Sequence, residues 1–441
     1  MTRSSRLAAL SAALVASMSF SAFALAQEVD DTTLDLAREA AHTGWATAEG
    51  GTTGGAEADD TQIYVVTTRA ELVDALGGDV SGNRDNDEPA IIFISGTIDL
   101  TEDDDGNPQD AEAFAHPDWD WHAYLAEYDP AVYGMEEEPA GPLEDARAAS
   151  QQAQAEHINI YVGSNKTLFG LGDDAVIRHG SLRLNGVSNV IIRNIEFQDS
   201  FDMFPGWDGT DGSEGNWNSE YDNIEIREST HVWLDHNTFN DGDRPDWEAG
   251  EVFGRVLQHH DGVTDIVAQS NYVTFSWNKI DNHDKTHIIG NSDSRTDDAD
   301  HLKVTLHHNH YINSGQRAPR VRFGEVHVFN NLHEHTADSQ LGFVYSYGVG
   351  LDSHIYAEAN AFVMPDVAPD RTIRPFNGEA IHVVDTLFNG EEIDLLEAFN
   401  AVNPDARLDD TVGWSPQYAY ELTPVAEVED AVRSGAGSGN L

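Results

Sequence analysis

Four carboxylate side chains in the middle of the chain could bind a cation. They are Glu220, Asp222, Asp261 and Asp265, and the group contains neither Cys nor His. Oxygen ligands of this kind suit a hard cation such as calcium, with water completing its coordination shell. In a chain with 78 carboxylates, an acidic pair is most often simply solvated surface. The four residues are therefore a candidate cation site only if the fold brings them together.

Basic residues are rare, so their positions carry information. The chain has 24 Lys and Arg against 78 Asp and Glu, and only four lysines. One of these, Lys285, lies in His283-Asp-Lys-Thr-His-Ile-Ile-Gly290, and Arg317 and Arg322 bound the segment Arg-Ala-Pro-Arg-Val-Arg. Such cations could bind the carboxylate of an acidic ligand. Zinc is not expected, because the histidines lack a clean ligand spacing.

Short strands separated by turn residues follow one another beyond residue 158, and several share one pattern. The Asn that ends each unit recurs at separations of 41, 31, 22 and 29 residues, and no helix-length pattern fills the gaps. A constant strand with variable spacing is typical of a parallel β-helix, where longer gaps carry loops. A sandwich with recurring Asn turns is the alternative. Each unit places a β-branched residue five positions before its Asn: Val232-Trp-Leu-Asp-His-Asn237, Val273-Thr-Phe-Ser-Trp-Asn278, Val304-Thr-Leu-His-His-Asn309, Val326-His-Val-Phe-Asn-Asn331 and Ile355-Tyr-Ala-Glu-Ala-Asn360.

The β-helix would position most of the candidate residues together. Asp222, Asp261, Asp265 and Arg317 each lie eight to twelve residues before the start of the next repeated unit. Equal phase on successive coils makes residues neighbours on one face, so these side chains could converge on one groove. Lys285 lies nineteen residues before its unit, so a longer loop must account for its position. Asparagine suits the bend, because it tolerates the left-handed region and can hydrogen-bond the next coil.

Composition narrows the class of protein further. The 441 residues contain no Cys and carry a net charge of -54, with carboxylates spread along the whole chain. This charge predicts a halophilic protein, because salt screens the self-repulsion. It disfavours binding to nucleic acid. We expect a monomer that does not act at a membrane.

The N-terminal residues predict export. Arg3 and Arg6 precede an apolar stretch that closes with Ala24-Leu25-Ala26, the layout of a secretory signal peptide over residues 1–26. The remaining residues, 27–441, are expected to form a single domain. Within it, residues 102–156 are acidic, show little strand alternation and are expected to be partly helical between Ala140 and Ala155. We interpret them as an insertion whose role the sequence does not reveal.

Taken together, the motifs resemble the pectate lyases of polysaccharide lyase family 1. The similarity runs from Gly44-Trp45 to Gly413-Trp414, interrupted by insertions. Each motif alone is weak, but their joint order is specific. The matching segments are Val162-Gly-Ser-Asn-Lys-Thr-Leu-Phe-Gly170, Val190-Ile-Ile-Arg-Asn194, Val232-Trp-Leu-Asp-His236, Asp261-Gly-Val-Thr-Asp-Ile266, Asp284-Lys-Thr-His-Ile-Ile-Gly290, Val304-Thr-Leu-His-His-Asn309 and Arg317-Ala-Pro-Arg-Val-Arg322.

The resemblance implies an all-β, right-handed parallel β-helix that cleaves 1,4-linked galacturonate by β-elimination. By motif position, it assigns Arg317 as the catalytic base and Lys285 and Arg322 as ligands of the substrate carboxylate. It assigns calcium binding to Asp222, Asp261 and Asp265, and more weakly to Glu220, where some relatives have a further acidic ligand. Three alternatives remain: a calcium-independent pectin lyase, a glycoside hydrolase such as a polygalacturonase, and a non-catalytic pectin-binding β-helix.

Overall fold

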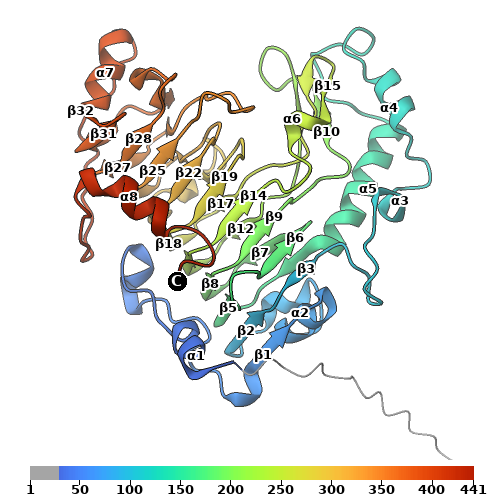
Figure 1. The fold of residues 1–441 in the computed structure, drawn as a ribbon. Helices are drawn as coiled ribbons and strands as arrows, with labels where there is room; N and C mark the ends of the chain where they lie inside the picture. The colour runs from blue at the N-terminus through green and yellow to red at the C-terminus, as the bar shows by residue number, and fades with distance from the viewer. Residues whose placement is uncertain (1–28) are drawn as a thin grey trace, which may run out of the picture.

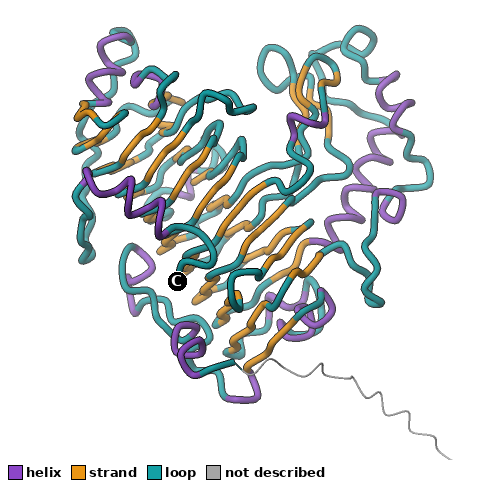
Figure 2. Tube along the Cα trace, viewed as in Figure 1, coloured by secondary structure: helices purple, strands orange, loops and turns teal. Residues whose placement is uncertain are grey.

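The computed structural model describes residues 29–441, so the predicted signal peptide over residues 1–26 lies outside the described residues. Three long sheets of short strands run the length of the molecule (Figures 1 and 2). Sheet 1 contains β1 (Ile63–Val66), β2 (Ala90–Ile94), β5 (Lys166–Gly170), β8 (Ser188–Arg193), β13 (Thr230–Asp235), β18 (Asn271–Ser276), β21 (Val304–His307), β24 (Glu325–Phe329), β27 (His354–Glu358) and β30 (His382–Val384).

The other two sheets complete the three faces of each coil. Sheet 2 contains β3 (Thr97–Asp99), β6 (Val176–Arg178), β9 (Glu196–Gln198), β14 (Thr238–Asn240), β19 (Lys279–Asp281), β22 (His310–Ile312), β25 (Leu332–Glu334), β28 (Ala361–Val363), β31 (Thr386–Phe388) and β32 (Glu391–Ile393). Sheet 3 contains β4 (Asn159–Tyr161), β7 (Ser181–Asn185), β12 (Ile224–Arg227), β17 (Thr264–Val267), β20 (Ile288–Ile289), β23 (Arg320–Val321), β26 (Tyr347–Gly350) and β29 (Ile373–Phe376).

Each coil passes through sheet 3, sheet 1 and sheet 2 in turn, as β12, β13 and β14 do, and then returns to sheet 3 through a loop. Equivalent strands of successive coils pair in parallel, apart from the final pair β31–β32. The β-branched residues that open the repeated units, Val232, Val273, Val304, Val326 and Ile355, are in register. The expected right-handed parallel β-helix is confirmed, and the parallel pairing excludes the sandwich.

The interior is filled by stacked apolar side chains. The same five in-register aliphatic residues are fully buried, and Leu234, Phe275 and Leu306 form a second buried row two positions along. Burying one such side chain contributes roughly 1.5–3 kcal/mol. Because every coil contributes to both rows, the core is continuous along the axis, and no coil is stable without its neighbours.

An asparagine ladder closes the bend between sheets 1 and 2. The side-chain oxygen of Asn309 accepts hydrogen bonds from the backbone and side chain of Asn278, at 2.9 and 3.3 Å, and Asn331 receives the same pair from Asn309. The predicted bonds to the neighbouring coil are therefore confirmed. The prediction that these residues occupy the left-handed region was wrong. The preceding residue does so, as His308 (φ 54°) shows, because it turns the chain and leaves the Asn side chain inside the bend.

Residues 102–156 form a helical excursion from the second coil. It contains α3 (Ala111–Phe114), α4 (Trp121–Glu127) and α5 (Pro142–Ile158), so the expected helix between 140 and 155 is confirmed. Pro142 opens α5, where a missing N–H costs nothing, and Glu144 and Asp145 follow in its first turn, as the helix dipole favours. The C-terminal end of α5 leads directly into β4, the first strand of sheet 3.

Aromatic side chains join this excursion to two hairpins in the loops that precede β12 and β17. The hairpins are β10–β11 (Gly206–Asp208 and Asn216–Asn218) and β15–β16 (Glu251–Val252 and Arg255–Val256), the latter after helix α6 (Asp246–Ala249). Tyr124, Tyr128, Trp207 and Trp217 are buried in this cluster. Figure 1 shows α4, α5 and both hairpins gathered beside the N-terminal coils. They form one wall beside sheet 3.

The remaining α-helices lie towards the two ends of the described chain. They are α1 (Asp31–Ala37), α2 (Arg69–Leu76), α7 (Leu395–Val402) and α8 (Val425–Gly435), with 3-10 turns η1 (Trp45–Gly50), η2 (Asp60–Gln62), η3 (Gly82–Asp85), η4 (Thr296–Asp298) and η5 (Pro369–Thr372). None of the helices formed by residues 29–441 combines the length and apolar character needed to cross a bilayer.

Candidate active site

The candidate residues lie where the loops from sheet 2 enter the strands of sheet 3. Asp222 comes two residues before β12, and Asp265 lies within β17. Single bridges join Gly262 to Lys285 and Lys285 to Gln316, so three successive coils are in parallel register at this edge. Lys285 is therefore in phase with the other residues. The additional residues that displaced it in the sequence lie after β20, in the loop that contains η4.

Asp222 and Asp265 face a common point at Gly262. A Cβ atom at Gly262 would lie 2.5 Å from Oδ1 of Asp222 and 2.9 Å from Oδ1 of Asp265. The Gly262 N–H donates to Oδ1 of Asp222 at 2.8 Å. Burial, and then repulsion from Asp265 and Asp261, raise the pKa of Asp222 well above its ordinary value. Burial and Asp261 likewise raise the pKa of Asp265. Neither carboxylate therefore has enough positive charge nearby to balance its own negative charge.

Asp261 is compensated differently. Lys285 donates from Nζ to Oδ1 of Asp261 at 3.0 Å, and the side chain of Lys285 is only 7% exposed. Burial would raise the pKa of Asp261, but Lys285 and then Arg317 lower it. The same ion pair raises the pKa of Lys285 against the effect of burial. A carboxylate and an ammonium group are therefore held together beside the two uncompensated aspartates.

Arg317 completes the group, held by an unusual backbone conformation. Its φ of 65° lies in the left-handed region, which costs energy for a residue with a side chain. Its carbonyl accepts a hydrogen bond from His287 N at 2.8 Å, and the next residue, Ala318, donates to Ser346 O at 2.8 Å, which fixes the conformation. The buried Nε of Arg317 has no hydrogen-bond partner among residues 29–441. Burial lowers the pKa of Arg317, but Asp261 and Asp265 raise it above its ordinary value.

The other two predicted residues lie at the margin of this group. Arg322 donates from Nε to Asp293 at 2.6 Å and from Nη1 to the Gly290 carbonyl at 2.8 Å, rather than to the aspartates. Glu220 lies at the surface with part of its side chain against the protein, and this partial desolvation, followed by repulsion from Asp261, raises its pKa. The structure thus brings together Asp222, Asp261, Asp265, Lys285 and Arg317, with Glu220 beside them and Arg322 further along the sheet.

Sequence reasoning missed two residues on the same face. Arg320 lies over the ring of Phe376 at 3.9 Å, and its pKa is lowered by burial and then by Arg322. Tyr345 has a buried hydroxyl with no hydrogen-bond partner in the described part of the chain. The signal for Arg320 is its place in the basic segment Arg317-Ala-Pro-Arg-Val-Arg322, two residues before Arg322. Tyr345 lies outside every repeated motif, and no signal indicated it.

The donor set fits a hard cation. Three aspartates, two of them short of positive charge, offer only oxygen ligands, and the space that a Cβ would fill at Gly262 lies between two of them. Among residues 29–441, no three His, Asp or Glu side chains already stand in a geometry that holds a metal ion. Because Lys285 engages Asp261, binding by all three aspartates requires that ion pair to rearrange.

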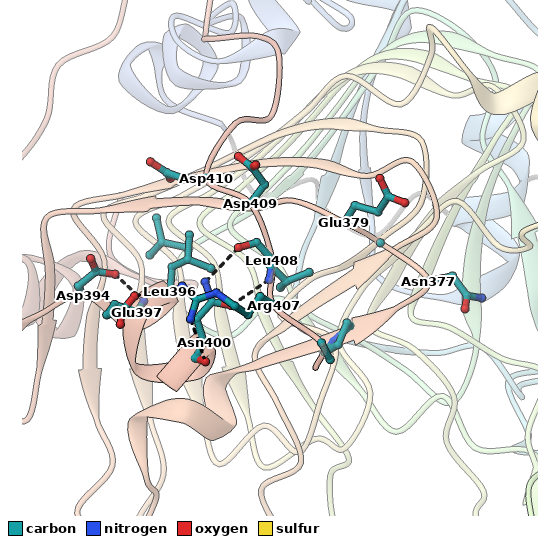
Figure 3. A pocket seen from close by; sticks show the side chains of 14 residues that line it. Asn377, Glu379, Asp394, Leu396, Glu397, Asn400, Arg407, Leu408, Asp409 and Asp410 are labelled. Carbon is teal, nitrogen blue, oxygen red and sulfur yellow. Dashed lines mark hydrogen bonds and ion pairs between the residues drawn. The ribbon is translucent and has the colours of Figure 1, made fainter. Parts of the chain in front are cut away.

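A pocket near the C-terminal end of the β-helix contains none of the candidate site residues. Figure 3 shows its lining, which comes from β29, α7 and the following loop. Its acidic residues, Glu379, Asp394, Glu397, Asp409 and Asp410, accompany a single arginine, Arg407. Some of its polar groups bond within the pocket, as Asn400 does with Leu408. Others bond outside it, as Asn377 does with Asp293 and Asp410 does with His382.

Comparison with known proteins decides the family. A family profile described as pectate lyase matches residues 139–441. The pectate lyase of Bacillus subtilis (strain 168) is 45% identical over 400 residues, which cover 90% of this chain and 92% of that protein. The chain belongs to the pectate lyase family. It is accordingly a polysaccharide lyase, and the expected family resemblance is confirmed.

Solved pectate lyases share the whole architecture. A thermostable pectate lyase superimposes with a TM-score of 0.90 at 46% identity, covering 92% of this chain and 99% of the other. A pectate lyase bound to a hexasaccharide superimposes with a TM-score of 0.87 at 43% identity, covering 92% of this chain and all of the other. Both superpositions cover 92% of this chain, so the fold described above is that of solved pectate lyases.

Proposed function

We propose that this pectate lyase cleaves 1,4-linked polygalacturonate by calcium-dependent β-elimination at the edge of sheet 3. One observation supports the proposal above all. Three aspartates lie together with Lys285 and Arg317 at one place on the coil, although the loops that contain them are far apart in sequence. A hydrolase would need an acid and a base on either side of a glycosidic bond. The acidic residues here instead gather on one point, which suits a cation and an anionic substrate.

The proposed reaction needs a base, a leaving group and stabilisation of negative charge. Arg317 accepts the proton from C5 of a galacturonate unit. The electrons of the C5–H bond form a double bond between C4 and C5, the bond from C4 to the glycosidic oxygen breaks, and that oxygen leaves and takes a proton. Asp222, Asp261 and Asp265 would hold a calcium ion, which when bound would supply positive charge where the uronate carboxylate becomes more negative. Lys285 and Arg322 bind the same carboxylate.

Lys285 connects cation binding to substrate binding. Its ammonium group pairs with Asp261, and an aspartate that becomes a cation ligand no longer holds it as strongly. Lys285 is then available for the substrate carboxylate. The proposal therefore assigns two successive partners to one side chain.

Arginine is an unusual base, because its guanidinium normally stays protonated. Asp261 and Asp265 raise the pKa of Arg317. Positive charge placed among these carboxylates cancels that effect, and burial and the neighbouring Lys285 then lower the pKa. Because only the neutral guanidine accepts a proton, the rate is expected to rise with pH, giving an alkaline optimum.

The net charge and the substrate charge have the same sign, so the proposal also depends on salt. Exposed carboxylates repel polygalacturonate at long range, but the Debye length falls to about 3 Å at 1 M salt. Contacts made by Lys285, Arg317 and Arg322 act at shorter range than this. We therefore propose that the enzyme works at high salt, with its acidic surface serving solubility.

The deciding experiment is an incubation with polygalacturonate and calcium at high salt, followed by the ultraviolet absorbance of the conjugated unsaturated product. The proposal expects absorbance to rise, and to stop rising when a chelator is added. Activity that survives the chelator, especially on methyl-esterified polymer, supports the pectin lyase alternative. New reducing ends without an absorbance rise support a hydrolase, and the absence of both products supports a binding protein.

We also propose that the mature enzyme is exported and begins at Gln27. Support comes from Arg3, Arg6 and the small residues Ala24 and Ala26 around the apolar stretch. N-terminal sequencing of the protein recovered from culture medium tests this proposal. A start at Gln27 supports it, and retention in cells with residues 1–26 intact contradicts it.

A further inference from the structure

The helical excursion over residues 102–156 contacts the segment that carries the first aspartate. Helix α5 runs beside the long loop between β9 and β12, and this loop ends at Glu220, Tyr221 and Asp222. The helix and loop are joined by hydrogen bonds between residues that are about 50 to 70 positions apart in sequence. The contacts fall into two sets, one at the start of the loop and one at its end.

At the start of the loop, two side chains of α5 bond backbone groups and a third bonds the carboxylate of Asp202. Arg147 donates from Nη1 to the Phe204 carbonyl at 2.7 Å. Gln154, which is fully buried, donates to the Phe201 carbonyl at 2.7 Å and accepts from Met203 N at 3.0 Å. Gln151 donates from Nε2 to Oδ2 of Asp202 at 2.6 Å. The loop therefore cannot shift along the helix without breaking several buried hydrogen bonds.

At the end of the loop, Tyr221 bonds Gln151 directly, and Glu220 is connected to Gln151 through Asp202. The hydroxyl of Tyr221 donates to the backbone carbonyl of Gln151 at 2.8 Å, and Tyr221 is only 1% exposed. The backbone N–H of Glu220 donates to Oδ2 of Asp202 at 3.2 Å, the same oxygen that Gln151 binds. Asp202 is fully buried, so this oxygen is shielded from bulk solvent.

We infer that helix α5 is a positioning element for the cation site, and that Gln151, Asp202 and Tyr221 are its positioning residues. They fix the backbone of Glu220 and Tyr221, and so set where the Asp222 carboxylate stands relative to Asp265. Residues that orient metal ligands from the second layer typically change metal affinity by about 10- to 100-fold when they are replaced. This inference rests on the proposed function, because it assumes that Asp222 binds the cation.

The decisive variant is Tyr221→Phe, which removes one hydrogen bond to Gln151 while keeping the buried ring. Its matched control is Tyr128→Phe. Tyr128 is also fully buried in the excursion; its hydroxyl donates to the Ala140 carbonyl at 3.1 Å and accepts from Glu144 N at 3.3 Å, but it has no bond to the loop that ends at Asp222. Both variants lose one buried tyrosine hydroxyl, so their thermal midpoints without calcium should fall by similar amounts.

Calcium affinity then separates positioning from general stability. Calcium binding is measured by titration calorimetry in about 1 M KCl, which screens the many surface carboxylates. The part of the calcium-binding heat that the wild type shows and the Asp222→Asn variant lacks is assigned to the site. We expect the dissociation constant to rise about 10-fold in Tyr221→Phe and to stay unchanged in Tyr128→Phe. Saturating calcium should restore kcat to Tyr221→Phe.

A second variant covers the case in which Tyr221→Phe does not fold. Gln151→Ala removes the bond to Asp202 but keeps the carbonyl that Tyr221 uses, and it should also weaken calcium binding. If wild type and both tyrosine variants bind calcium equally, the role of α5 is refuted while the calcium site stands. If wild type binds no calcium that depends on Asp222, the proposed function fails first, and the inference falls with it.

Discussion

A methyl group at Gly262 tests the cation site without removing any of its ligands. In Gly262→Ala the new Cβ lies 2.5 Å from Oδ1 of Asp222 and 2.9 Å from Oδ1 of Asp265, where ordinary contacts begin at 3.4 Å. Both carboxylates must therefore move apart by several tenths of an ångström. The backbone itself tolerates alanine, because Gly262 does not have a positive φ.

The cost can be estimated from this displacement. Overpacking of this kind destabilises a fold by about 1–3 kcal/mol. Displacing two ligands should weaken calcium by about 10- to 100-fold, since each factor of ten corresponds to about 1.4 kcal/mol. Turnover at saturating polygalacturonate should then require correspondingly more calcium. The measurements are the initial rate of unsaturated product as a function of calcium, and calcium binding by calorimetry.

Gly342→Ala is the matched control. Gly342 lies in the loop before β26 of the same sheet, also without a positive φ, and an added Cβ there meets no atom within 4 Å. This variant should keep wild-type calcium dependence. If Gly262→Ala keeps it as well, the point between Asp222 and Asp265 is not where the cation binds, and the reasoning is refuted.

Three further outcomes follow from the structure. Arg317→Lys keeps the charge but loses the guanidine, so kcat should fall by about 10²–10⁴-fold with an unchanged thermal midpoint; a rate near wild type excludes Arg317 as the base. Asn309→Ala removes the four buried hydrogen bonds that the Asn309 side chain makes and should lower the free energy of unfolding, measured in urea, by several kcal/mol; a loss below about 1 kcal/mol means that the ladder contributes little. Burial opposes the shift, but bonds from His310 and Arg433 lower the pKa of Glu334 to about 2. Stability from this carboxylate is therefore complete above its ordinary pKa of 4.5 and is lost as pH falls towards 2, so acid denaturation of Glu334→Gln should have a shallower pH slope over that window, and equal slopes contradict the assignment.

The repeated units were predictable because one physical requirement recurs in every coil. A buried β-branched residue and a bonded Asn must each meet their counterpart on the next coil, so Val304 and Asn309 repeat the pattern of Val273 and Asn278. The position of the left-handed residue was not predictable, because His308, Trp277 and Ala359 share no side-chain chemistry. What they share is their place before the ladder, which only the backbone reveals.

The candidate site was predictable in its members but not in its pairings. Asp222, Asp261 and Arg317 lie at similar distances in sequence before the next repeated strand. This spacing is visible in the sequence, and it predicts that the three residues meet at one edge of the helix. The ion pair of Lys285 with Asp261 depends on side-chain geometry within a few ångströms, which spacing does not encode. The excursion over residues 102–156 has no repeat, so its contacts with the loop before Asp222 appear only in three dimensions.

The central claim is that Asp222, Asp261 and Asp265 hold a single cation beside Lys285 and Arg317. A crystal structure of the protein soaked with calcium, with the ion located by its anomalous scattering, tests it most directly. The account predicts one ion with oxygen atoms of all three aspartates within about 2.3–2.6 Å, and Lys285 Nζ released from Asp261. An ion bound elsewhere, or one that leaves Asp222 and Asp265 without contact, contradicts it.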